Sequence, residues 1–203
     1  MCDKHLRDED AGESMYRFRN TLVVFIISTI FSIPVLAVTG NRTLYNTLMA
    51  LLGSTWPPIT IWGFVTAIFT HPTILDYAFD MMTLWLIGPF FETVYGSRNF
   101  WSTFLLSGVA STLSPILYYA MGTPVIVGGS SGALFGLVGF IIATPYRGVI
   151  LSNPINILAI IFLLSPLAFA FGIAYLGHLL GFIIGLIMGY AYSRKIVLPE
   201  PIF

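Results

Sequence analysis

Two adjacent serines in a glycine-rich stretch and a distant histidine are the residues of this sequence with the clearest chemical potential. Ser130 and Ser131 lie in "VGGSSGALFG" at 127–136, and His178 lies in "LGHLLGFIIGLIMG" at 176–189. A serine hydroxyl becomes a nucleophile when a histidine at about 2.6–3.2 Å can accept its proton. These residue types therefore predict acyl-transfer chemistry, provided that the fold brings the histidine to one of the serines.

The composition indicates an all-α, polytopic membrane protein. The 203 residues are 57% hydrophobic and 9% charged, whereas a soluble domain carries about 25% charged residues. Crossing the hydrocarbon core takes about 20 residues of helix. We expect a membrane domain at 20–195 between polar tails at 1–19 and 196–203. Six membrane spans are predicted, at about 20–39, 72–95, 99–120, 131–145, 154–173 and 174–194.

The charges favour one orientation and exclude some partners. A net charge of zero offers no electrostatic footprint for nucleic acid, and the few Cys and His residues predict neither a metal nor another cofactor. Under the positive-inside rule, both termini are expected in the cytoplasm, with Arg42 alone on the outer side. The cytoplasmic Lys and Arg residues would be Lys4, Arg7, Arg17, Arg19, Arg98, Arg147, Arg194 and Lys195.

The predicted fourth span is too short to cross a membrane. Residues 131–144 make about 21 Å of helix, against a hydrocarbon core of roughly 30 Å. If the helix ends at the cytoplasmic interface near "PYRG", it must begin inside the membrane. Non-helical backbone at that depth has to be buried in protein or line a watery cavity. Ser130 and Ser131 are therefore expected at a helix N-terminus, in a pocket that water can reach.

A row of glycines on the last span offers a way to bring His178 to the serines. Small residues spaced by four let membrane helices approach closely. The close approach of the fourth and sixth spans would place a serine beside His178. There are two alternatives. One is a packing seam that carries a structural histidine, and the other is a proton or ion path through Asp76, Asp80 and His178. The row consists of Gly177, Gly181, Gly185 and Gly189, and Gly132 and Gly136 are the predicted packing glycines of the fourth span.

Ionisable residues inside membrane spans are expensive and indicate function by default. Asp76 and Asp80 are four residues apart on the second span and share a helical face. Glu92 lies near the cytoplasmic end of the same span, where we expect an ion pair with Arg98. His71 precedes Pro72, which suits the first position of a helix, and is expected at the helix cap.

Several of these segments together resemble the rhomboid family of intramembrane serine proteases, over nearly the whole chain. "GSSG" at 129–132 is similar to the family's Gly-x-Ser-Gly motif, and "GHLLGFIIG" at 177–185 to its last-helix pattern of a small residue, histidine and spaced glycines. "IWGFVTAIFTH" at 61–71 resembles the first-loop segment, and "LIGPFFETVYGSRNFW" at 86–101 the end of the second helix. Six spans suit the compact bacterial or archaeal form.

The resemblance assigns roles to the site residues. Ser131 has Gly129 two residues before it and glycine directly after it, so it matches the nucleophile, whereas Ser130 does not fit that frame. His178 matches the general base of a Ser–His dyad, and Phe135 matches an aromatic residue that packs against the catalytic histidine. The family uses no third acidic residue.

The second span departs from the family pattern. The family has His-x4-His-x3-Asn, where the later His and Asn hold the oxyanion, and this chain has His71-x4-Asp76-x3-Asp80. An ionised carboxylate beside an oxyanion would oppose the reaction, because donors are needed there. We therefore expect one of the two aspartates to be protonated and to donate a hydrogen bond. The Ser131 N–H, with His71, Gly129 and Ser130 nearby, would complete the oxyanion site.

The resemblance thus implies an integral protein of a prokaryotic plasma membrane that cleaves membrane proteins. Its substrates would be transmembrane segments cut near their outer ends, through an acyl-enzyme, at a site open to the outside. A rhomboid-like protein that binds membrane clients without cutting them is the alternative, favoured by the altered second span and opposed by the presence of both Ser131 and His178. A small transporter is the third possibility, and no internal repeat supports it.

Overall fold

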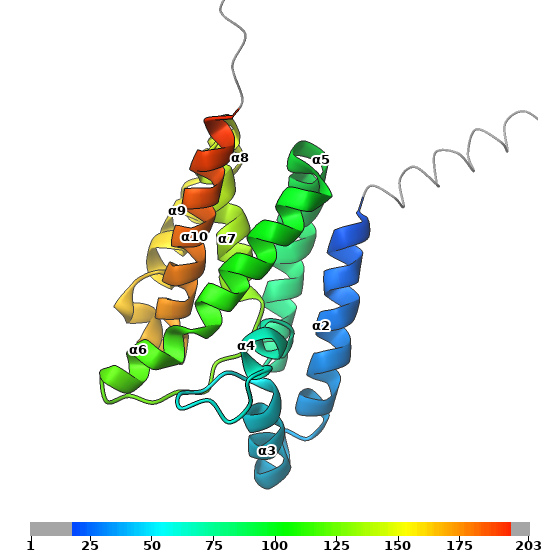
Figure 1. Ribbon diagram of the computed structural model, residues 1–203, viewed down its shortest axis with the longest axis vertical. Helices are drawn as coiled ribbons and strands as arrows, with labels where there is room; N and C mark the ends of the chain where they lie inside the picture. The colour runs from blue at the N-terminus through cyan, green and yellow to red at the C-terminus, as the bar shows by residue number, and fades with distance from the viewer. Residues whose placement is uncertain (1–17, 196–203) are drawn as a thin grey trace, which may run out of the picture.

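The fold is a bundle of helices in the computed structural model, which describes residues 18–195 (Figure 1). The predicted tail at 196–203, and most of the one at 1–19, lie outside the described residues, as do Lys4, Arg7 and Arg17. The longer helices are α2 (Arg19–Ala37), α3 (Arg42–Leu52), α5 (Ile74–Thr112), α6 (Ser114–Ala120), α7 (Ser131–Ile142), α9 (Pro154–Leu163) and α10 (Tyr175–Ser193). The short ones are α4 (Gly63–Thr66), η1 (Ala67–Phe69), η2 (Pro145–Arg147), α8 (Gly148–Leu151) and η3 (Pro166–Phe171).

Helix α5 contains a sharp break that turns the chain back on itself. Gly96 has φ 78° and ψ 165°, a conformation that a side chain would strain and that interrupts the helix. Figure 1 shows two arms meeting near this break, at residues 74–95 and 97–112. The break lies within one residue of the end of the predicted second span, and the second arm leads directly into α6.

The described helices confirm an all-α membrane fold. Three segments are long and apolar enough to cross a bilayer: Arg19–Ala37, Tyr175–Ser193 and Ile74–Ala120, which the break at Gly96 divides into two arms. A fourth is added if α7 and the segment Pro145–Leu151, bent by 114°, are counted as one span. Since α9 has only 10 residues, the count of six spans stays a prediction.

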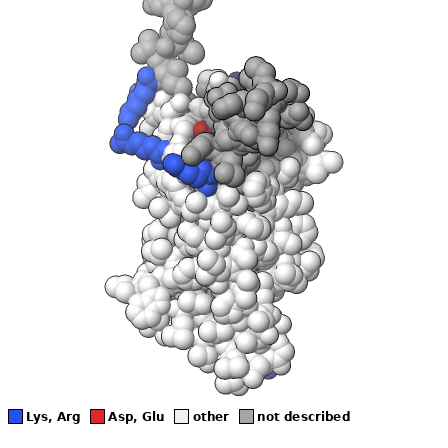
Figure 2. Space-filling model, turned by 90° about the vertical axis from the view of Figure 1, so that its right-hand side faces the viewer, with Lys and Arg blue, Asp and Glu red and all other residues white. Residues whose placement is uncertain are grey.

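The outer surface of the bundle is apolar. Ile26, Ile30 and Ile33 of α2 are exposed, whereas its buried face includes Thr21 and Ser28. This arrangement reverses that of a soluble helix and suits a lipid environment. On the face drawn in Figure 2, Lys and Arg side chains gather at one end and the long middle is uncharged.

Helix α7 is the central element. Eight of its twelve residues are buried, and it packs between α5 and α10. Twelve residues give about 18 Å of helix, so α7 is short, as the sequence predicts. Its N-terminus at Ser131 lies toward the end of the bundle that carries α3 and α6, opposite the described chain ends (Figure 1).

The prediction of an ion pair between Glu92 and Arg98 is wrong. Glu92 is buried, and its carboxylate accepts hydrogen bonds from the backbone N–H groups of Asn20 at 2.9 Å and Thr21 at 2.6 Å. These N–H groups begin α2, where an α-helix leaves donors without partners. The Glu92 carboxylate on α5 thus caps the N-terminus of α2. These buried hydrogen bonds stabilise the carboxylate more than an exposed ion pair with arginine would.

We expect Glu92→Leu to destabilise the protein and Arg98→Gln to leave stability nearly unchanged. The first change leaves two buried N–H groups without their charged acceptor, a loss of about 2–4 kcal/mol. Thermal unfolding of the purified protein in detergent measures both. A larger loss with Arg98→Gln than with Glu92→Leu would contradict this account.

Candidate active site

The segment ahead of α7 is fixed by backbone contacts with the first loop. Val127 forms an antiparallel bridge with Ser54, through two N–H···O bonds of 2.9 Å. The N–H of Gly129 donates to the carbonyl of Ala67 at 2.9 Å. Gly129 has φ 118°, which a residue with a side chain rarely adopts. This backbone places Ser131 as the first residue of α7, facing the interior.

The structure brings Ser131 and His178 into hydrogen-bond contact. The Ser131 Oγ lies 2.8 Å from the Nε2 of His178, and the Nδ1 of His178 lies 3.1 Å from the carbonyl oxygen of Leu163. A carbonyl only accepts, so Nδ1 carries the proton and Nε2 keeps the lone pair that can receive the serine proton. Phe135 stacks on the imidazole at a centroid distance of 4.8 Å and an interplanar angle of 24°.

The glycines of α10 make this contact possible. A Cβ added at Gly181 or Gly185 would overlap the carbonyl oxygens of Gly132 and Gly136 respectively, and one at Gly189 would overlap that of Phe140. The backbones of α7 and α10 therefore touch, and the helices that carry Ser131 and His178 are held at the distance the hydrogen bond needs. At the N-terminal end of the row, a Cβ at Gly177 would lie 2.9 Å from the Ser111 Oγ.

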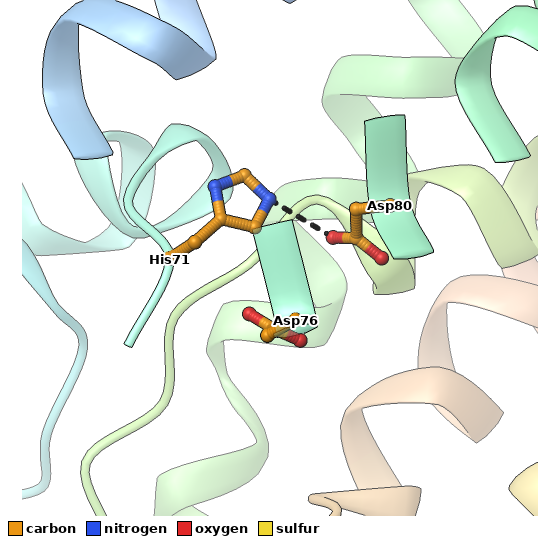
Figure 3. Close-up of side chains that lie close together, drawn as sticks. All are labelled: His71, Asp76 and Asp80. Carbon is orange, nitrogen blue, oxygen red and sulfur yellow. Dashed lines mark hydrogen bonds and ion pairs between the residues drawn. The ribbon is translucent and has the colours of Figure 1, made fainter. Parts of the chain in front are cut away.

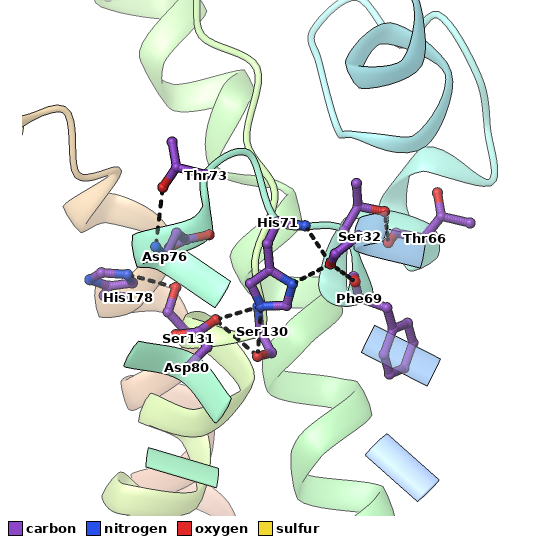
Figure 4. Close-up of polar contacts among 11 residues, drawn as sticks. Ser32, Thr66, Phe69, His71, Thr73, Asp76, Asp80, Ser130, Ser131 and His178 are labelled. Atoms are coloured by element: carbon purple, nitrogen blue, oxygen red, sulfur yellow. Dashed lines mark hydrogen bonds and ion pairs between the residues drawn. The ribbon is translucent and has the colours of Figure 1, made fainter. Parts of the chain in front are cut away.

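Ser130 faces away from this pair, into a buried polar network (Figure 4). Its Oγ–H donates to the Oδ2 of Asp80 at 2.9 Å, and its backbone N–H donates to the Nε2 of His71 at 3.3 Å. That nitrogen lies 3.1 Å from the same Asp80 oxygen. The Nδ1 of His71 lies 2.8 Å from the Ser32 Oγ on α2. His71 and Ser130 are fully buried, so the network holds the loop ahead of Ser131.

Asp76 lies in the first turn of α5. Thr73 caps the helix by accepting the N–H of Asp76 at 3.1 Å, which corrects the expected cap at His71. The Oδ2 of Asp76 is buried and has no hydrogen-bond partner within the described chain. One ligand atom each from His71, Asp76 and Asp80 lies within 4.8 Å of the others (Figure 3). These are the residue types of a divalent-cation site, although the Nε2 of His71 already contacts Asp80.

Sequence reasoning missed three residues that orient the site. Ser32 on α2 holds His71, Leu163 on α9 supplies the carbonyl that sets the tautomer of His178, and Thr73 caps α5. Ser32 and Thr73 are common polar residues in apolar surroundings, and Leu163 acts through its backbone. Only Thr73, a cap residue directly ahead of an apolar run, carries a signal that sequence inspection could have found.

Helices with an apolar exterior define an integral membrane protein, and its Ser–His pair lies near one end of the bundle. A family model described as the Rhomboid domain matches residues 58–195, and the chain therefore belongs to the rhomboid family. The resemblance of "GSSG" and "GHLLGFIIG" to that family is thus confirmed at the level of the family.

Similar proteins carry the names of proteases. The chain is 27% identical over 187 residues to the rhomboid protease GluP of Bacillus subtilis, covering 87% of this chain and 35% of GluP. It is 27% identical over 143 residues to the rhomboid protease GlpG of Yersinia pestis, covering 68% and 50% of the two chains. The mitochondrial Rhomboid protein 1 of Saccharomyces cerevisiae is 30% identical over 141 residues, 63% of this chain and 41% of its own. The aligned region is thus half or less of each of these relatives.

Proposed function

We propose that this protein is an intramembrane serine protease that cleaves transmembrane segments of other membrane proteins. The contact of 2.8 Å between the Ser131 Oγ and the His178 Nε2 carries the proposal. Membership of a family whose relatives are named proteases supports it. No organic cofactor enters the proposed reaction.

The proposed reaction uses Ser131 as the nucleophile and His178 as the general base. Nε2 removes the Ser131 proton as Oγ attacks the peptide carbonyl, and the carbonyl electron pair moves onto its oxygen. His178 then gives the proton to the leaving amine, which leaves an acyl-enzyme. Water, activated by the same nitrogen, releases the second product. The Ser131 N–H, at the start of α7, lacks a partner within its helix and is a donor for the oxyanion.

The proposed orientation places both termini in the cytoplasm of a prokaryotic cell and the site toward the outside. The imbalance of eight cationic residues to one supports it. Residues 18 and 195, the described chain ends, lie at the same end of the bundle, and the N-terminal ends of α7 and α10 lie at the other (Figure 1). A polar tail at 1–19, a membrane domain at 20–195 and a tail at 196–203 complete this topology.

A fluorophosphonate probe tests whether Ser131 is an activated nucleophile. We expect the wild type to be labelled covalently and Ser131→Ala to remain unlabelled, because the probe reacts with a serine whose proton a base removes. Ser152→Ala, at an exposed position between α8 and α9, is the matched control and should label like the wild type. A folded wild type that never labels, yet binds membrane proteins, would favour the client-binding alternative.

A further inference from the structure

The two aspartates on α5 share a helical face but have different surroundings. Asp80 is buried, accepts the Ser130 hydroxyl and contacts His71. Asp76 donates its backbone N–H to Thr73, and its Oδ2 is buried without a hydrogen-bond partner in the described chain. The two acids at these family positions therefore differ. The carboxyl group of Asp80 is hydrogen-bonded, and the Oδ2 of Asp76 has no partner in the described chain.

The free carboxyl group faces the backbone that leads into the nucleophile. A Cβ built on Gly129 would lie 3.0 Å from the Asp76 Oδ2 and 3.5 Å from the Asp80 Oδ2. Gly129 is two residues ahead of Ser131, and Figure 4 shows Asp76 next to the Ser131–His178 pair. An oxyanion formed on attack by the Ser131 Oγ would develop close to this carboxyl group.

The groups around Asp76 offer an ionised carboxylate little compensation. Asp80 lies one turn along the same helix, and the Nε2 of His71 accepts the Ser130 N–H and contacts Asp80 at 3.1 Å rather than Asp76. His178 faces the site from α10, where it must stay neutral to act as a base. From α3, outside the membrane spans, Tyr45 donates its hydroxyl to the Pro72 carbonyl, and burial together with the Asp76 carboxyl raises the pKa of Tyr45.

A neutral carboxylic acid fits this position better than a carboxylate. A buried ionised oxygen without a donor is costly, and a second negative charge at the oxyanion would raise the barrier. The O–H of a neutral acid needs an acceptor, and no residue between 18 and 195 supplies one to this oxygen. The oxyanion formed on the substrate would be a strong acceptor for this O–H, because hydrogen bonds of the type O–H···O⁻ are short and strong.

We propose that Asp76 acts as a neutral acid that donates a hydrogen bond to the oxyanion, while Asp80 is a positioning residue for His71 and Ser130. This inference rests on the proposed protease function. Asp76 keeps its proton throughout. The proton released by Ser131 goes to His178 and then to the leaving amine, so the hydrogen bond stabilises the intermediate without altering the proton balance.

The active enzyme then needs Asp76 protonated and His178 neutral. Raising the pH removes the Asp76 proton, and activity falls by about tenfold per pH unit above that titration. Lowering the pH protonates His178 and also reduces the rate. The pH profile of the wild type is therefore bell-shaped, and its alkaline limb belongs to Asp76.

The test is the rate of cleavage of a fluorogenic transmembrane peptide in detergent, from about pH 4 to pH 9. We expect Asp76→Asn to lose the alkaline limb, keep the acid limb and retain a rate within about tenfold of the wild-type maximum, since an amide also donates. Asp76→Ala should be about 10²-fold slower in kcat than the wild-type maximum and should also lack the alkaline limb. Asp80→Asn is the matched control, and it should keep an alkaline limb because Asp76 is intact.

Three results would overturn the inference. One is an Asp76→Asn enzyme with the same alkaline limb as the wild type, and another is an Asp76→Ala enzyme with an unchanged maximal rate. The third is activity that a chelator removes and Mn²⁺ or Zn²⁺ restores, which would assign the two carboxyl groups to a cation. Thermal unfolding of each variant separates a folding defect from a catalytic one.

If the wild type neither cleaves nor labels at Ser131 at any pH, the proposed function fails and this inference with it. Labelling with an unchanged limb overturns this inference alone.

Discussion

Ser131→Ala is expected to reduce cleavage of a transmembrane substrate by at least about 10³-fold, with His178→Ala causing a loss of similar size. The two side chains form one unit, because the hydroxyl attacks only when the Nε2 lone pair takes its proton. Removal of either therefore removes the same step, and the double variant should be no slower than the single ones. The measurement is product formation from a model substrate in detergent.

Ser130→Ala is the informative comparison, because the two serines are adjacent and only one contacts His178. Ser130 donates to Asp80 instead, so its loss should weaken the polar network and slow the enzyme by about tenfold without abolishing labelling. If Ser130→Ala and Ser131→Ala exchanged these outcomes, the assignment of the nucleophile would be wrong.

Much of the membrane fold could be predicted because its signals are local and periodic. The apolar run of α2, the short α7 that begins at Ser131 and the spaced glycines of α10 all lie within single helices. The glycine row also predicted which two helices approach each other, because glycines spaced by four allow close packing only where another helix backbone lies against them. The approach of His178 to a serine followed from that one contact.

Long-range hydrogen bonds to backbone groups could not be predicted. Glu92 caps a helix through the N–H of Asn20, 72 residues earlier in the chain. The carbonyl that orients His178 belongs to Leu163, a residue without polar side-chain atoms. Every residue carries a backbone donor or acceptor, so residue type does not show which of them meets a buried side chain. Charge alone therefore favoured Arg98 as the partner of Glu92.

The difference between Asp76 and Asp80 also needed three-dimensional information. Their spacing places both on one helical face, and the sequence treats them alike. Ser130 and His71 come from two other segments and meet only Asp80. Which acid is engaged and which is free is thus decided by the loop ahead of α7, whose path depends on its backbone bonds to Ser54 and Ala67.

Gly185→Ala is expected to destabilise the protein by at least about 3 kcal/mol and to slow cleavage by about 10²-fold. The added methyl group would overlap the carbonyl oxygen of Gly136, and a backbone atom inside a helix cannot rotate away as a side chain can. The helices α7 and α10 must then separate, which lengthens the contact between Ser131 and His178. Thermal unfolding and the cleavage rate, both in detergent, measure the two effects.

The glycine positions allow a graded comparison. At Gly177 the added methyl group meets the Ser111 Oγ at 2.9 Å, and that hydroxyl belongs to a side chain that can turn, so Gly177→Ala should be milder than Gly185→Ala. Gly148, at the start of α8, has open space around it, and Gly148→Ala should leave stability and activity nearly unchanged. Equal effects at all three positions would mean that backbone contact does not hold the two helices together. The predicted order, with the largest loss at Gly185, instead ties the catalytic distance to the close packing of α7 and α10.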